Sequence, residues 1–145
     1  MTVAEVIGAR SPCVRTRVGA VIVTPTNRIV ATGYNGAPAG LPSVRTCTEI
    51  CPRPSSTAPD PLYHDCVSIH AEANALLFCD RREREGGTIY TTSAICWNCA
   101  KLVANSGLSR LVMYAPTDDV MHRLPESSVD LLVRSGVVVH QLGKD

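Results

Sequence analysis

The sequence is poor in aromatic residues, has almost no net charge and contains no long apolar run. Aromatic residues make up 4% of the 145 positions, with one Trp and one Phe, and 14 basic against 13 acidic residues give a net charge of +1. A long polyanion would therefore need a local basic patch, and few aromatic side chains are present for stacking single-stranded bases. A membrane-spanning helix needs roughly 20 apolar residues. We expect neither a nucleic-acid partner nor a membrane.

The composition favours a compact, cytoplasmic chain. Residues 1–10 lack a basic leader followed by an apolar stretch, which argues against a secretory signal. Hydrophobic residues make up 45% and charged residues 19% of the chain, which fits neither disorder nor a fibrous repeat. A chain of 145 residues suits one core. We therefore expect a single domain over residues 1–145.

Hydrophobic patterning predicts an α/β protein. After an N-terminal helix, turn formers separate two apolar runs and predict a hairpin. Six of the ten prolines then lie in an irregular loop insertion at about 37–66. Beyond it, helices alternate with strands, so the later strands should run parallel in a sheet covered by helices. The predicted elements are strands Val18–Val23 and Arg28–Tyr34, a helix from about His70 to about Arg81, strand Thr88–Thr92, helix Trp97–Ser106, strand Arg110–Tyr114, a helix from Ser127 or Ser128 to Arg134, and strand Val137–Gln141.

Cysteine is the unusual feature of the composition. Seven cysteines are too few for a small disulfide scaffold, and an odd number cannot pair completely within one chain. Cys96 and Cys99 form a tight pair at the predicted start of one helix, and His70 and Glu72 lie at the predicted start of another. By itself, the cysteine pair is as typical of a redox pair or a structural zinc knuckle as of a catalytic metal site.

Taken together, these four side chains predict a catalytic zinc site. A helix start stabilises negative charge, so Cys96 and Cys99 can be held as thiolates, and with the His70 imidazole they supply three ligands. Zinc prefers four ligands, which leaves one position for water, and the metal lowers the pKa of that water from about 15.7 to about 7. Glu72 is too close to His70 to be an easy ligand and is placed to move protons.

The pattern H-x-E followed by C-x-x-C is that of zinc-dependent base and nucleoside deaminases. The chain resembles the cytidine and deoxycytidylate deaminase superfamily over most of its length, with the greatest likeness to the deoxycytidylate branch. The segments that carry the resemblance are Val18–Val23, Gly33–Pro38, His70–Ala75 and Cys96–Lys101.

This resemblance implies a three-layer α/β/α domain with a central five-stranded mixed sheet. It implies zinc-dependent hydrolytic deamination of dCMP to dUMP with release of ammonia, carried out by a homo-oligomer. His70, Cys96 and Cys99 match the zinc ligands, Glu72 matches the proton shuttle, and Asn35 matches the sugar-contacting asparagine. From the residues alone, Asn35 is also typical of a turn.

Two positions depart from the family pattern. Relatives usually carry proline where this chain has Ile95, and several carry cysteine where it has Val44. Proline would fix φ before the helix, so Ile95 predicts a less rigid ligand loop and leaves the fit to substrate open. The alternatives are a deaminase of another or modified cytosine nucleotide, a deaminase of a base in nucleic acid, and a catalytically inactive binding module stabilised by zinc.

Further candidate ligands lie close to the proposed site. Cys66, four residues before His70, could close the fourth zinc position and make the site structural. A second, structural zinc could instead clamp the irregular loop through Cys47, Cys51, His64 and Cys66, or these could be reduced thiols and an exposed histidine. Arg81 lies in a mixed-charge run typical of a solvated face, with phosphate or effector binding as the alternative.

Overall fold

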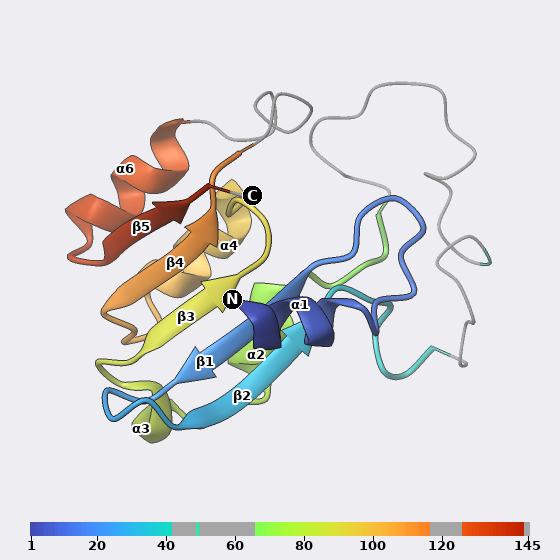
Figure 1. Cartoon of the computed structure of the whole chain (residues 1–145), viewed down its shortest axis with the longest axis horizontal. Helices are drawn as coiled ribbons and strands as arrows, with labels where there is room; N and C mark the ends of the chain where they lie inside the picture. The colour runs from blue at the N-terminus through green and yellow to red at the C-terminus, as the bar shows by residue number, and fades with distance from the viewer. Residues whose placement is uncertain (42–48, 50–65, 117–125, 144–145) are drawn as a thin grey trace.

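A computed structural model describes residues 1–41, 49, 66–116 and 126–143. In these ranges the strands form one five-stranded sheet of order β2-β1-β3-β4-β5 (Figure 1). The strands are β1 (Gly19–Val23), β2 (Ile29–Tyr34), β3 (Thr88–Thr91), β4 (Arg110–Tyr114) and β5 (Val138–Leu142). Most of the loop insertion predicted at about 37–66 lies outside the described residues, as does Val44. The single domain over residues 1–145 with this insertion therefore stays a prediction.

The strand directions confirm a mixed sheet. β1 pairs antiparallel with β2 and with β3, whereas β3 pairs parallel with β4 and β4 with β5. The predicted hairpin is present, and Asn27, whose φ is 62°, lies in its turn. The parallel pairs follow from the crossover helices between the later strands. The antiparallel contact of β3 with β1 closes the two halves into one sheet.

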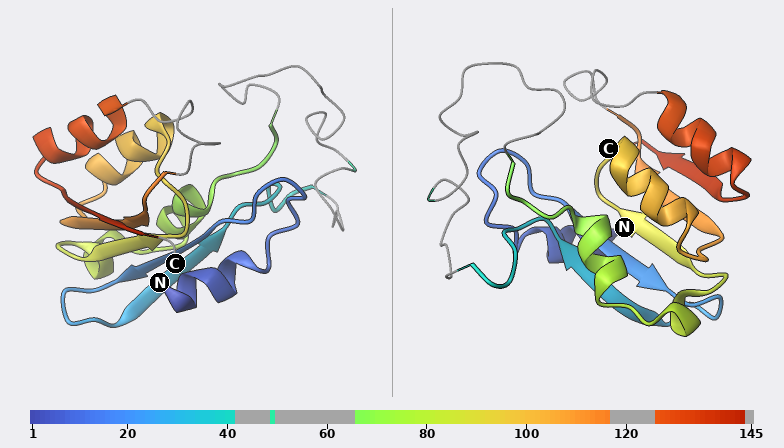
Figure 2. Two further views of the ribbon diagram at one scale, coloured as in Figure 1. Left: turned by 45° about the horizontal axis from the view of Figure 1, so that its top comes forward. Right: turned by 180° about the vertical axis from the view of Figure 1, so that it is seen from behind.

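Helices cover both faces of the sheet (Figure 2). On one face lies α1 (Thr2–Gly8), and on the other lie α2 (Ala71–Leu77), α4 (Trp97–Ala104) and α6 (Glu126–Arg134). Successive residues of β1 point to opposite faces: Ile22 belongs to the larger core under α2 and α4, whereas Val21 packs with Ala4 of α1. The three-layer α/β/α arrangement expected from the resemblance is confirmed. None of the helices in the described ranges has the length and apolarity needed to cross a membrane.

Two helix boundaries differ from the prediction. The helix expected from His70 to about Arg81 ends at Leu77, and a separate short helix, α3 (Arg81–Arg84), follows. The division has a local cause, because the Asp80 side chain accepts a hydrogen bond from the Arg82 N–H at 2.8 Å and caps a new helix start. Similarly, α6 begins at Glu126, so Ser128 is not its cap and lies buried inside the helix.

The absence of a side chain at Gly33 lets α2 lie directly against β2. A Cβ atom at this position would lie 2.3 Å from the Ala71 carbonyl oxygen and 2.5 Å from the Ala75 nitrogen. These are backbone atoms, so they cannot move aside without shifting the helix. Gly33 therefore sets the depth at which the first turn of α2 sits on the sheet.

We expect Gly33→Ala to lower the free energy of unfolding by about 1–3 kcal/mol, the usual effect of overpacking. Urea denaturation measures this change. The matched control is Gly40→Ala, where a new Cβ would meet nothing within 4 Å. Equal stability of the two variants would contradict a close contact between β2 and α2.

Candidate metal centre and active site

Two helix starts bring the predicted site residues together. His70 is the N-cap of α2 and Glu72 lies in its first turn, whereas Cys96 is the N-cap of α4 and Cys99 lies in its first turn. Residue 69 is held to the end of β2 by two backbone hydrogen bonds, from Ile69 N to Gly36 O at 2.8 Å and from Gly36 N to Ile69 O at 3.1 Å. The sheet thus fixes where the His70 turn begins.

The three predicted metal ligands meet at the spacing that zinc requires. The His70 Nδ1 atom lies 3.4 Å from Cys96 Sγ and 3.5 Å from Cys99 Sγ, and the three atoms all lie within 4.8 Å of one another. Tetrahedral zinc with ordinary bond lengths places a nitrogen and a sulfur ligand about 3.5 Å apart. The residues therefore fit a zinc ion with three protein ligands.

The described residues do not place Cys66 in this group. Within them, the side chains gathered at metal-binding distance are His70, Cys96 and Cys99, although Cys66 is also described. A closed site completed by Cys66 consequently finds no support in this geometry. The second zinc predicted for the irregular loop stays a prediction, because Cys47, Cys51 and His64 lie outside the described residues.

Hydrogen bonds among the three ligand side chains shift their pKa values, so that one of the two cysteines becomes a thiolate. The hydrogen bond from the Cys99 thiol, helped by His70, lowers the pKa of Cys96 to about 4. The same hydrogen bond and burial raise the pKa of Cys99. The hydrogen bond between His70 and Cys96 raises the pKa of His70. Before metal binding, Cys96 is therefore a thiolate and Cys99 keeps its proton.

Glu72 lies buried beside the ligands and is oriented by the sheet. It is 4% exposed, and Thr91 of β3 donates a hydrogen bond from its Oγ1 to Glu72 Oε1 at 2.8 Å. Burial raises the pKa of Glu72, while the positive charge of His70 opposes this change. A carboxyl group whose pKa lies above its usual range suits reversible proton transfer near neutral pH.

The sequence did not predict the contact of Thr91 with Glu72. A threonine in a predicted strand is ordinary, and nothing in the chain between residues 72 and 91 indicates that the two side chains meet. The contact depends on the position of β3 under α2, which is a property of the tertiary fold.

Asn35 links the segment before β1 to the end of β2. Its Oδ1 atom accepts a hydrogen bond from Val18 N at 2.7 Å, and its Nδ2 atom donates one to Thr16 O at 2.9 Å. Since the next residue, Gly36, pairs with Ile69, Asn35 stands near the start of the His70 turn. These two bonds leave one amide hydrogen and one lone pair available to a ligand.

Ile95, which stands where the family pattern has proline, is held in a different way from the one we expected. Its side chain is fully buried, and its N–H donates to the Met113 Sδ atom at 3.4 Å. Packing and this weak hydrogen bond anchor the residue before Cys96, where a proline ring would act through φ.

The side chains of Arg81 and Trp97 lie at the surface. Arg81 is exposed and pairs with Glu85 at 3.3 Å, which fits the expectation of a solvated face. Trp97 is 40% exposed. It therefore does not belong to the core.

Comparison with known proteins agrees with this geometry. The sequence model of the cytidine and deoxycytidylate deaminase zinc-binding region matches residues 1–115. A deoxycytidylate deaminase of Mycobacterium phage D29 is 44% identical over 115 residues, which cover 76% of this chain and 87% of that protein. The deoxycytidylate deaminase of Saccharomyces cerevisiae is 35% identical over 142 residues, but this chain spans only 43% of its length.

A solved structure is similar over almost the whole chain. The dCMP deaminase of cyanophage S-TIM5 in complex with dCMP and dUMP superposes with a TM-score of 0.72 at 27% identity. The match covers 97% of this chain and 92% of that one.

We expect zinc binding at pH 6, where a zinc-bound water with a pKa of about 7 keeps most of its proton, to release between about one and two protons. Cys96 is already a thiolate, so the protons come from Cys99 and from the fraction of His70 that is protonated. Because protons leave on binding, the apparent zinc affinity should rise with pH, about tenfold per pH unit for each proton released.

Isothermal titration calorimetry in two buffers of different ionisation enthalpy counts these protons. Release of more than two protons would show that Cys96 still holds its own. The proposed sharing of protons between the two cysteines would then be wrong.

Proposed function

The chain belongs to the cytidine and deoxycytidylate deaminase family, and from this premise we propose that it catalyses the zinc-dependent hydrolytic deamination of dCMP to dUMP with release of ammonia. The observation that carries the proposal is the placement of a buried carboxyl group, Glu72, in the first turn of the helix that His70 caps, together with three ligand atoms at zinc-binding distances. The choice of dCMP is supported by the phage and yeast relatives and by the cyanophage enzyme solved with dCMP and dUMP.

His70, Cys96 and Cys99 hold the zinc ion in this proposal. When bound, zinc supplies a Lewis acid that makes a water molecule a nucleophile at neutral pH. The three side chains would supply three of the four ligands that zinc prefers, and they are held in place because two of them are helix N-caps and the third lies within the first turn. Replacing either cysteine should therefore cost the metal first and activity as a consequence.

Glu72 moves the protons. It takes one proton from the attacking water and delivers it to N3 of the cytosine ring, and a second proton passes to the amino group as the bond from C4 to nitrogen breaks. Thr91 keeps the carboxyl group in place for both transfers, since it donates a hydrogen bond to one of its oxygens. A raised pKa lets the same group serve as base and then as acid.

A panel of substrates tests the reaction. We expect ammonia release from dCMP, and much less from cytidine, dCTP, modified dCMP and single-stranded DNA. If any of these other compounds reacts faster than dCMP, that compound is the substrate and dCMP is not. If the zinc-loaded protein turns over none of the compounds, dCMP included, it is a binding module.

The Glu72→Gln variant is the matched control for this panel. It keeps the shape of the side chain but cannot move a proton, so zinc content should stay at the wild-type level while kcat falls by about 10²-fold or more. Near-normal turnover would reject the assigned role of Glu72.

Asn35 contacts the sugar of the nucleotide in this proposal, through the amide hydrogen and the lone pair that its two loop contacts leave over. We expect Asn35→Ala to raise KM for dCMP by about tenfold, the usual effect of losing a hydrogen bond. The control is Ser11→Ala, which removes the bond from Ser11 Oγ to Asn35 O and leaves the amide intact. An equal rise in KM for both variants would mean that Asn35 acts through the loop alone.

We further propose that the chain forms one domain over residues 1–145, with the segment 37–66 as a loop insertion, and works as a homo-oligomer in the cytoplasm. A reducing compartment keeps the two cysteines available to zinc. Leu77 and Phe78 are 73% and 75% exposed at the end of α2, and Leu102 of α4, a helix on the same face of the sheet (Figure 2), is 48% exposed. Such a face is typical of contact with another subunit.

Light scattering checks the assembly. We expect a mass above that of one chain and a shift toward the monomer in Phe78→Glu. A monomer at micromolar concentration would contradict the proposal.

A further inference from the structure

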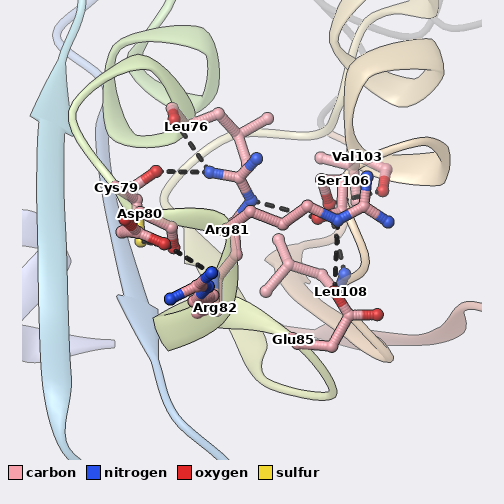
Figure 3. A network of polar contacts seen from close by, with 10 residues as sticks. Leu76, Cys79, Asp80, Arg81, Arg82, Glu85, Val103, Ser106 and Leu108 are labelled. Atoms are coloured by element: carbon pink, nitrogen blue, oxygen red, sulfur yellow. Dashed lines mark hydrogen bonds and ion pairs between the residues drawn. The ribbon is translucent and has the colours of Figure 1, made fainter.

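The two helices that carry the metal ligands meet again at their opposite ends. His70 and Glu72 lie at the start of α2, and Cys96 and Cys99 lie at the start of α4. At the far ends, α2 is followed by α3 and α4 is followed by a turn at residues 105–109. We name this meeting point the distal junction and define it by Leu76, Cys79, Arg84 and Ser106 (Figure 3).

Arg84 bonds both helix ends through different nitrogens. Its Nε atom donates to Ser106 O, after α4, at 3.0 Å. Its Nη1 atom donates to Leu76 O, in the last turn of α2, at 3.2 Å and also to Cys79 O. Carbonyl groups at a helix end lack partners within the helix and carry negative partial charge, so a guanidinium group suits them. Arg84 is half-buried, which limits competition from water.

The backbone around Arg84 makes the distal junction rigid. Gly86 N donates to Gly107 O at 2.8 Å, and Ser109 Oγ donates to Gly86 O at 2.6 Å. Within the turn, Ser106 Oγ donates to Val103 O at 2.7 Å and ties the residue that Arg84 contacts to the last turn of α4. Arg84 therefore joins two segments that are each well fixed.

Small movements at the junction become large at the ligands. The helices contain 7 and 8 residues, so each is about 11 Å long. A change of about 5° in the angle between them would move one ligand by about 1 Å relative to the others. Metal sites tolerate about 0.2 Å in a ligand distance. The angle between α2 and α4 must consequently be held closely.

We propose that Arg84 is a positioning residue for the metal centre: by bonding a carbonyl group in the last turn of α2 and one in the turn that directly follows α4, it sets the separation of His70 from Cys96 and Cys99. This inference rests on the proposed zinc-dependent function. It goes beyond that function, because Arg84 touches neither a ligand side chain nor the carboxyl group of Glu72.

The test compares Arg84→Lys and Arg84→Met with the wild-type protein. Lysine keeps the charge but carries its three donors on one nitrogen atom, so it cannot reproduce contacts that Arg84 makes from two nitrogens at different positions, and methionine keeps an apolar stem without donors. The readouts are the visible absorption spectrum of the Co²⁺-substituted protein, the rate at which a chelator removes zinc, and kcat and KM separately. The spectrum reports ligand geometry and does not depend on the substrate.

Two control variants separate positioning from loss of stability and loss of charge. Val21→Ala weakens the small core on the opposite face of the sheet, where α1 packs. Arg82→Met removes an exposed positive charge from α3, and only the backbone of Arg82 takes part in the Asp80 cap. Neither change touches α2 or α4.

We expect both Arg84 variants to show an altered Co²⁺ spectrum and about 10- to 100-fold faster zinc loss, the usual effect of removing a partner outside the ligand shell. kcat should fall more than KM changes, whereas both controls should keep the wild-type spectrum. If Arg84→Met does not fold, Arg84→Lys decides by the same criteria. A wild-type spectrum and zinc-loss rate in Arg84→Lys, or equal changes in Val21→Ala, would overturn the proposal. A wild-type protein that binds no metal would instead refute the proposed function itself.

Discussion

The chemistry of this protein depends on the distance between the starts of two separate helices. Neither α2 nor α4 holds a complete set of ligands, and the nitrogen and sulfur atoms must lie about 3.5 Å apart for tetrahedral zinc. The sheet supplies this distance, because α2 packs against β2 at Gly33 and its first turn is tied to the end of β2 through Gly36. At the other end, Arg84 joins the same two helices. The site is thus held from both ends.

The protonation of the ligand side chains follows from the short distances between them. Three groups that would each titrate in the ordinary way in water are brought within hydrogen-bond distance, so that one thiol becomes a thiolate and the other keeps its proton. Burial raises the pKa of Glu72 above that of an exposed glutamate. The hydrogen bond from Thr91 offsets part of the free-energy cost of burying this carboxyl group. Metal binding and proton transfer consequently use residues whose protonation is set by the fold.

Local patterns in the chain predicted much of the architecture and missed features that depend on distant contacts. The hairpin, the parallel strands and the helix starts near His70 and Cys96 follow from turn formers, periodicity and caps, which act over a few residues. The long helix predicted from His70 was wrong, because its composition favours a helix throughout while the single side chain of Asp80 starts a new one. The anchoring of Ile95 by Met113 also joins residues far apart in the chain.

What the sequence by itself determined is the set of side chains from which the site is built: three that fit a zinc ion, one carboxyl group to which we assign proton transfer, and the helix starts on which they lie. These are properties of residue types and short spacings, so they need no knowledge of the fold. The tertiary structure alone decided that the three ligand atoms meet, that Cys66 stays out of their group in the described residues, that Thr91 bonds Glu72, and that Arg84 bonds Leu76 and Ser106. The reason is physical, since each of these contacts joins segments whose mutual position is set by packing on a shared sheet, and packing leaves no signal in the residues next to either partner.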